Sequence, residues 1–440
     1  MPPLNESEKL GVDADLDPSH RWLSANFPLM VLYYVLLRVG WIFKTESIIM
    51  PAVLDLIGGG GWLRGCLPML NRFGQSIPPM LASDRVKRLP RKKYALSACS
   101  CSMGLCFLAL SFVWYFSGVQ RAGSAGVWLP VVFLLIYGVF FVSVGLHNLS
   151  GSLIQGKLLP VTIRGRYLFF GMTIGSTIAV LAAWFILRRW LGEETGQFVY
   201  IFAFTGMAFL LGSGIALLLR EEPEDFGGKQ MPFVDILRGC LGTLVIDKNF
   251  RRLAIVASLF GMTITLFPHY QALGRGRLEL GLTSLVPWVI AQSIGAASFS
   301  IPLGWIADRF GNRLVLRCLM LLMCVAPVVA LLSANYGDLF GPRSYYLVFF
   351  LLGLFPVGMR AFNNYTLEIV SARHQPKYLS TLSLCMAAPA ILTSWAVGGL
   401  VEKAGFEFAF ILVVACVFMG WVLTFRLEEP RKKTAKKRQL

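Results

Sequence analysis

Charged residues are scarce in this sequence of 440 residues. Asp, Glu, Lys and Arg make up 15% of it, whereas soluble proteins average about 25%. Hydrophobic residues account for 56%, enough to fill about twelve membrane-spanning helices of ~20 residues each. This composition argues against a soluble globular protein, and it excludes disordered and collagen-like chains.

Signatures of metal, disulfide and nucleotide chemistry are also missing. The nine cysteines form no C-x-x-C pair, so neither a zinc site nor a disulfide framework is predicted, and we expect no cofactor. No G-x4-G-K-[ST] motif is present, which argues against ATP as the direct energy source. Residues 1–26 lack the basic and apolar segments of a signal peptide, so the first apolar run should stay in the mature protein.

Long apolar runs divide the sequence into two sets of six, separated by a polar stretch. We therefore predict an all-α integral membrane protein with twelve transmembrane helices in two pseudo-symmetric six-helix halves. The predicted spans lie at residues 27–50, 62–82, 94–116, 128–150, 167–188, 198–219, 252–272, 283–306, 314–333, 344–369, 379–400 and 406–426. The predicted segments are an N-terminal segment (1–26), a first half (27–219), a linker (220–251), a second half (252–426) and a basic tail (427–440).

Lys and Arg are distributed unevenly between the two sides of this predicted protein. Of the 41, 29 lie in the termini, the linker and the loops on the same side, and 8 lie in the opposite loops. Because basic residues hold loops in the cytoplasm, we predict cytoplasmic termini in a cell membrane, with the bacterial cytoplasmic membrane favoured. The net charge of +17 is then explained by basic residues that face the anionic surface of the lipid bilayer. No nucleic-acid partner is needed to explain it.

A repeated motif supports two similar halves. Ser76-Ile77-Pro78-x5-Asp84-Arg85 recurs as Ser300-Ile301-Pro302-x5-Asp308-Arg309, at the same end of the second span of each half. Two similar halves around a central site are typical of transporters that expose the site to each side of the membrane in turn.

The second copy of this motif continues as Gly304-x3-Asp308-Arg309-x-Gly311-x-Arg313 and resembles the cytoplasmic-loop signature of the major facilitator superfamily. The resemblance implies a twelve-helix transporter without catalytic residues. The first copy departs from the signature, since Met80 and Lys87 stand where the family prefers glycine. A carboxylate followed by basic residues can bridge helix ends and lipid phosphates. We therefore predict a conformational latch formed by Asp84, Arg85, Gly304, Asp308, Arg309, Gly311 and Arg313.

Polar side chains inside the predicted spans are the candidates for a binding site, because such groups are costly in hydrocarbon. Those of the second, fourth and tenth spans recur at helical spacing, so each set draws a stripe along one face. The predicted substrate-binding residues are Arg38, Arg72, Gln75, His147, Asn148, Arg360, Asn363 and Asn364. The predicted coupling residues are Glu46 and Glu368. A second interpretation stays open, in which the arginines form structural pairs with Glu46, Asp55 or Glu368.

The leading functional hypothesis is a secondary transporter that moves a small solute as a monomer and is coupled to a proton or sodium ion. The arginines inside the spans slightly favour an organic anion. Drug/proton antiporters of the superfamily usually carry an arginine in the fourth span, where this chain has His147-Asn148, so multidrug efflux is not favoured. The alternatives are an integral-membrane enzyme, for which no H-x4-D motif is found, and a non-transporting sensor or assembly factor on the same scaffold.

Overall fold

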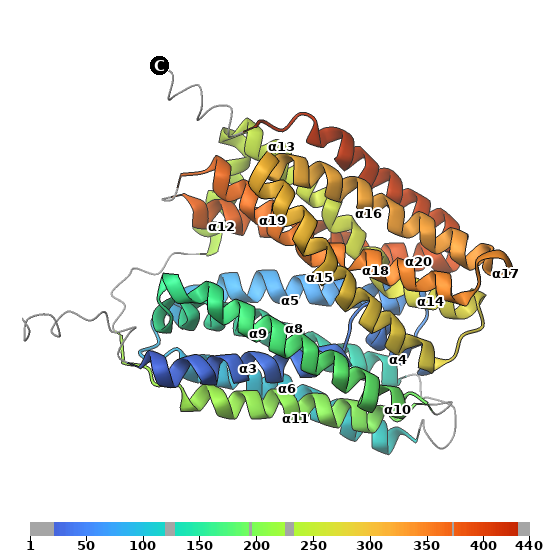
Figure 1. The fold of residues 1–440 in the computed structure, drawn as a ribbon, viewed down its shortest axis with the longest axis horizontal. Coiled ribbons are helices and arrows are strands. Elements are labelled where there is room, and N and C mark those ends of the chain that lie inside the picture. The colour runs from blue at the N-terminus through green and yellow to red at the C-terminus, as the bar shows by residue number, and fades with distance from the viewer. Residues whose placement is uncertain (1–21, 119–127, 193–195, 225–232, 372–373, 430–440) are drawn as a thin grey trace, which may run out of the picture.

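The computed structural model describes residues 22–118, 128–192, 196–224, 233–371 and 374–429. These residues form helices and connecting turns, and no β-strand occurs among them. The prediction of an all-α protein is confirmed. Two bundles of helices lie one above the other, with the N-terminal half below the C-terminal half in the view of Figure 1.

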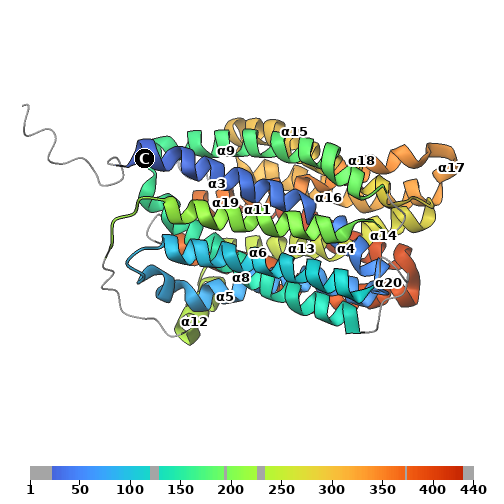
Figure 2. The same cartoon turned by 90° about the horizontal axis from the view of Figure 1, so that it is seen from below.

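The helices of the N-terminal half run side by side (Figures 1 and 2). A π-helical turn, η1 (Ala183–Leu187), joins α9 to α10. The helices are α3 (Leu23–Phe43), α4 (Ile49–Leu56), α5 (Gly61–Lys87), α6 (Lys93–Ser117), α8 (Trp128–Leu158), α9 (Val161–Ala182), α10 (Arg188–Trp190) and α11 (Phe198–Leu218).

The C-terminal half repeats this arrangement with more interruptions. Short 3-10 turns, η2 (Met262–Leu266), η3 (Leu282–Ser284) and η4 (Pro342–Tyr345), join several of its helices. The helices are α12 (Phe233–Ile246), α13 (Lys248–Gly261), α14 (Phe267–Arg277), α15 (Leu285–Phe310), α16 (Asn312–Asn335), α17 (Gly337–Phe340), α18 (Tyr346–Leu352), α19 (Leu354–Ile369) and α20 (Gln375–Thr424).

Ten helical segments in the described residues are long and apolar enough to cross a membrane. One of them, α20, has 50 residues and a non-helical backbone at Gly405, which lies between the two last predicted spans. The polar helix α5 is not among the ten, although its 27 residues cover the second predicted span. Dividing α20 at Gly405 and adding α5 would give twelve. The exact number of spans stays a prediction.

Several predicted boundaries differ from the structure, and two of these differences have a clear local cause. The first span was expected to continue to residue 50, but α3 ends at Phe43 and a turn precedes α4. The break falls at the polar residues Lys44 and Glu46, which form an ion pair with each other. The seventh span was expected to begin at residue 252, but α13 begins at Lys248, because the Asp247 side chain accepts hydrogen bonds from the first backbone amides of α13 and so caps this helix.

Large apolar side chains cover much of the outer surface. Leu135, Phe185, Ile301 and Ile411 are each more than 60% exposed. Monomeric soluble proteins rarely expose apolar surface on this scale, whereas the hydrocarbon of a bilayer solvates it. The surface therefore agrees with the multi-pass membrane protein that the ten apolar helices define.

The two halves are joined at the end of the bundle opposite the linker. We name this the far end, and the end at which α12 lies the linker end (Figure 1). At the far end α5 of one half crosses α20 of the other, and a Cβ atom added to Gly398 would collide with the backbone of Gly61. The two helices therefore pack backbone to backbone.

Candidate functional site

A cavity of ≈ 360 Å³ opens within the N-terminal half. Four of the predicted binding residues line it: Arg38, Gln75, His147 and Asn148. They come from α3, α5 and α8, so the cavity is where three helices bring their polar faces together. The other lining residues are Met30, Tyr33, Tyr34, Leu37, Trp41, Leu96, Met103, Gly151, Ser152, Ile154, Gln155, Tyr167, Leu168 and Leu219.

Arg38 is held in the cavity wall by the close packing of α3 on α9. A Cβ atom added to Gly175 would lie 3.3 Å from Cβ of Arg38, and one added to Gly171 would lie 3.2 Å from the Tyr34 ring. These two glycines let the helices approach closely. Neither a hydrogen bond nor an ion pair joins the Arg38 guanidinium to another described residue.

His147 is held from the opposite side of the cavity. Its Nε2 atom lies 2.6 Å from the hydroxyl of Tyr33, and the two rings are stacked with their centres 5.9 Å apart. The same hydroxyl lies 2.7 Å from Oγ of Ser100 on α6. The imidazole is thus oriented by two neighbouring helices, as a group with a positional role requires.

A chain of amide side chains leads from His147 to Glu46. Asn148 donates to Gln75 over 3.5 Å, and Gln75 donates to Asn71 over 2.9 Å. Asn71 in turn donates to the carboxylate of Glu46. The first of these contacts is long, but the order of residues is continuous along α8 and α5. It connects the cavity with an ionised group near the far end.

Glu46 also forms an ion pair with Lys44, whose Nζ atom lies 2.5 Å from Oε1 of the carboxylate. The Lys44 side chain is fully buried. Its ammonium lies 3.3 Å from the centre of the Trp41 ring and 4.7 Å from that of Phe140. A buried cation therefore has one carboxylate and the faces of aromatic rings as its partners.

Arg72 projects toward the other half. Its guanidinium carbon lies 5.2 Å from the centre of the Phe355 ring on α19, and its Nε atom is buried without a hydrogen-bond partner. The predicted residues of α19, namely Arg360, Asn363, Asn364 and Glu368, are exposed. They line no cavity together with Arg38, so the structure divides the predicted site between the two halves.

The carboxylates that could neutralise the three arginines are engaged elsewhere. Glu46 binds Lys44. Asp55 binds Arg64 and accepts a 2.7 Å hydrogen bond from Gln271, and Glu368 accepts one of 2.8 Å from Asn312. Among the described residues, the structure contains none of the ion pairs to Arg38, Arg72 or Arg360 that the second sequence interpretation required.

The predicted latch residues lie at the linker end. Asp84 and Arg85 belong to the last turn of α5, and Asp308 and Arg309 to the last turn of α15. Gly311 has a φ of 91° and separates α15 from α16, which contains Arg313. A Cβ atom added to Gly304 would meet no heavy atom within 4 Å. No other helix therefore packs closely against this glycine in this conformation.

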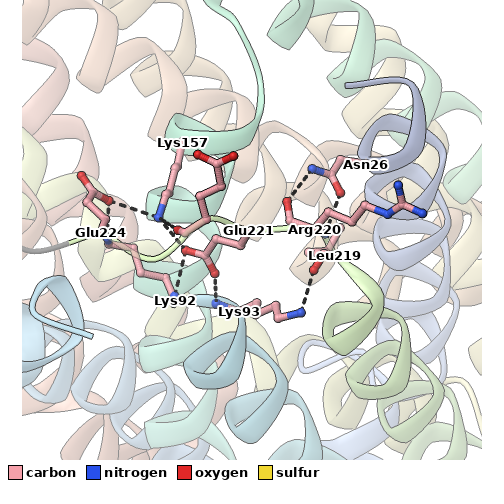
Figure 3. Close-up of polar contacts among 9 residues, drawn as sticks. Asn26, Lys92, Lys93, Lys157, Leu219, Arg220, Glu221 and Glu224 are labelled. Atoms are coloured by element: carbon pink, nitrogen blue, oxygen red, sulfur yellow. Dashed lines mark hydrogen bonds and ion pairs between the residues drawn. The ribbon is translucent and has the colours of Figure 1, made fainter. Parts of the chain in front are cut away.

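Sequence reasoning missed a polar network at the linker end, which Figure 3 shows. The buried carboxylate of Glu221 accepts hydrogen bonds from the backbone amides of Lys92 and Lys93 at 2.9 and 2.8 Å. Lys157 of α8 lies 3.1 Å from the same carboxylate. The first residues after α11 are thus bound through Glu221 to the start of α6 and the end of α8.

Glu224 and Arg220 extend this network. Glu224 forms an ion pair of 2.6 Å with Lys92, and this hydrogen bond lowers the pKa of the Glu224 carboxyl. The Asn26 side chain of α3 both donates to and accepts from the backbone of Arg220. A sequence signal was available, because Glu221-Glu222-Pro223 recurs as Glu428-Glu429-Pro430 after the last helix.

Comparison with known proteins finds a family match in the second half of the chain. Residues 253–440 match the Major Facilitator Superfamily model, and a search of curated proteins finds no match. A D-xylose-proton symporter is similar at 15% identity, with a TM-score of 0.70 over 92% of this chain and 98% of that one. The nucleoside transporter NupG has 12% identity and a TM-score of 0.64, over 92% and 98%.

Another similar structure is a bacterial homologue of the human lysosomal transporter Spinster, in an inward-facing and unoccupied conformation. It has 14% identity and a TM-score of 0.63, over 93% of this chain and 97% of that one. The whole chain therefore has the fold of these structures. Its second half also matches the major facilitator superfamily in sequence.

Proposed function

We propose that this protein is a secondary active transporter that moves a small organic anion by alternating access between its two halves. The observation that carries this proposal is the guanidinium of Arg38, which lines the cavity without a carboxylate partner. An unpaired arginine away from bulk water is costly, and a bound anion offsets that cost through paired hydrogen bonds. Arg72 and Arg360, which form no ion pair within the described residues, offer further anion contacts from the two halves.

The arrangement of the halves supports alternating access. Backbone packing of Gly61 against Gly398 and the bond from Gln271 to Asp55 close the far end. The open space at Gly304 leaves room for the latch residues to engage in the opposite state. Rocking one half against the other would exchange these two sets of contacts around a central site.

Glu46 is the coupling group in this proposal, and a proton is the coupling ion. Protonation of Glu46 would leave Lys44 without its carboxylate, and the chain through Asn71 and Gln75 would transmit this change to the cavity. Glu368 is the second coupling candidate, in the other half. The transporter acts as a monomer, with both termini and the linker in the cytoplasm.

Uptake into proteoliposomes tests the proposal. Purified protein should accumulate members of a panel of radiolabelled organic anions, and an inward proton gradient should accelerate uptake. Glu46→Gln should abolish the effect of the gradient, whereas Glu407→Gln, at an exposed far-end position, should not. An enzyme or a sensor on the same scaffold would accumulate none of the anions. Orientation is tested separately by labelling cysteines placed at Tyr336 and Arg251 from outside.

A further inference from the structure

We infer that the cavity binds a planar aromatic carboxylate, with Arg38 as the anchor of its acid group. This inference rests on the proposed function and narrows its substrate class. It follows from three properties of the cavity wall: its charge, the state of its polar side chains, and its aromatic residues.

The charge of the wall is carried by one side chain. Arg38 is the only Lys, Arg, Asp or Glu among the residues that line the cavity. Its guanidinium presents donors in a flat fork that fits a carboxylate with two parallel hydrogen bonds. A ligand with one negative charge therefore matches the charge of the cavity wall. The wall contains no carboxylate that could bind an amine.

The other polar side chains are mostly occupied by each other. His147 is bonded to Tyr33, and Asn148 and Gln75 are bonded to each other and to Asn71. A ligand with many hydroxyls would have to break these bonds or bury hydroxyls without partners, and each such group costs free energy. The neutral contacts left for a ligand are the side-chain amide of Gln155 and the hydroxyls of Tyr34 and Tyr167, which have no hydrogen-bond partner among the described residues. This is a poor wall for a sugar or a nucleoside.

Aromatic rings stand among the aliphatic residues of the remaining wall. Tyr34 and Tyr167 meet edge to face with their centres 6.3 Å apart, and Trp41 lies one helical turn from Arg38 on α3. Lys44 covers the Trp41 ring at 3.3 Å, and its positive charge favours an electron-rich partner ring. Rings of this kind bind a flat aromatic ligand by offset or edge contacts. The volume of ≈ 360 Å³ is at the small end of ligand sites and suits a fused ring with one short acid group.

Isothermal titration of the full-length protein in detergent tests this inference with four probes. Indole-3-carboxylate is the expected ligand. Indole-3-carboxamide keeps the ring and removes the charge, cyclohexanecarboxylate keeps the charge and removes the aromatic ring, and xylose is the polyol. We expect the first probe to bind about tenfold or more tightly than each of the others. Equal binding of the carboxamide, or tighter binding of xylose, would overturn the inference.

Variants locate the binding. Arg38→Lys should weaken binding of indole-3-carboxylate about tenfold, because a point charge replaces the planar fork, and Arg38→Ala should abolish it. Arg343→Lys, at an exposed far-end position, should bind like wild type. Unchanged binding in a folded Arg38→Lys protein would overturn the assignment of the anchor. If wild type binds indole-3-carboxylate without transporting it, the proposed function fails and the inference stands. If wild type transports another anion and binds no aromatic acid, the inference fails alone.

Discussion

Gln271 of α14 donates a 2.7 Å hydrogen bond to Asp55 at the end of α4, and this contact joins residues 216 positions apart in the two halves. Asp55 keeps a second partner, Arg64, within its own half. Removing the Gln271 side chain would therefore break the contact between the halves and leave the Asp55–Arg64 ion pair intact. The variant Gln271→Ala thus measures the contact between the halves alone.

This variant should weaken far-end closure by about 1.5 to 3 kcal/mol, the usual contribution of a hydrogen bond to a charged group. Distances between spin labels at Trp128 and Leu339, exposed positions of α8 and α17, should shift toward larger values. Glu407→Gln is the matched control, since its partner Arg277 belongs to the same half and the pair is exposed. A distance distribution that changes no more than in the control would contradict the role of Gln271.

The glycine contact between α5 and α20 offers a steric test. A methyl group at Gly398 would collide with the backbone of Gly61, whereas one at Gly399 would lie 3.5 Å from the Trp62 side chain, an ordinary contact. Gly398→Ala should cost about 1 to 3 kcal/mol of far-end closure by overpacking, and Gly399→Ala should cost little. Cysteine accessibility at Ile57, buried at the far end, measures the difference, and equal labelling of both variants would refute the close crossing.

The latch residues give a third prediction. Asp84→Asn and Asp308→Asn should slow transport without preventing membrane insertion, because they weaken contacts of the state closed at the linker end. A coupling of about 1 to 3 kcal/mol corresponds to a shift of 5- to 150-fold in population. Initial uptake rates in proteoliposomes, normalised to the amount of inserted protein, provide the measurement. Wild-type rates in both variants would remove the latch from the transport cycle.

Glu221 should contribute to the stability of the N-terminal half. Glu221→Ala leaves the backbone amides of Lys92 and Lys93 without their acceptor, and buried donors without partners cost about 1 to 3 kcal/mol each. The melting temperature in detergent should therefore fall clearly. Asp235→Ala, at a side chain that is 57% exposed, should leave it nearly unchanged. Equal melting temperatures in the two variants would argue against a structural role for the network.

The ion pair of Glu224 should make the linker end sensitive to acid. Its hydrogen bond from Lys92 lowers the pKa of the Glu224 carboxyl in the folded protein. Because the pKa of Glu224 is lower in the folded protein than its ordinary value of 4.5, the ionised carboxylate stabilises the fold at pH values above 4.5. This stabilisation is lost as the pH falls through the pKa of the folded state. Glu224→Gln should therefore lower the melting temperature at neutral pH and match wild type in strong acid. Parallel pH profiles would contradict this assignment.

Much of the fold could be predicted because the signal for a membrane helix is local. Each apolar run carries its own length, so the predicted spans and the described helices largely coincide, with the largest departures at the end of α8, which continues to Leu158 beyond the predicted residue 150, and at Lys44 and Glu46. Those two polar residues end α3 through an ion pair between side chains two positions apart. Hydropathy averages over such a detail and cannot place it.

The candidate site was predicted only in part. Arg38, Gln75, His147 and Asn148 could be selected because polar groups stand out in an apolar span. Tyr34, Trp41 and Tyr167 could not, since aromatic residues are ordinary members of membrane helices. The separation of Arg360 from the cavity depends on how the two halves are tilted in one conformation, which no local pattern encodes.

The attachment of the linker limits how far the two halves can move. Its first residues, through Glu224, are bound to the N-terminal half, and α12, which begins at Phe233, is bound to the C-terminal half through Thr243 and Thr381. The described residues on the two sides of the linker are thus anchored to different halves. A chain connection between two anchors limits their separation, so the halves are restrained from moving apart at the linker end, whereas no chain connection joins them at the far end.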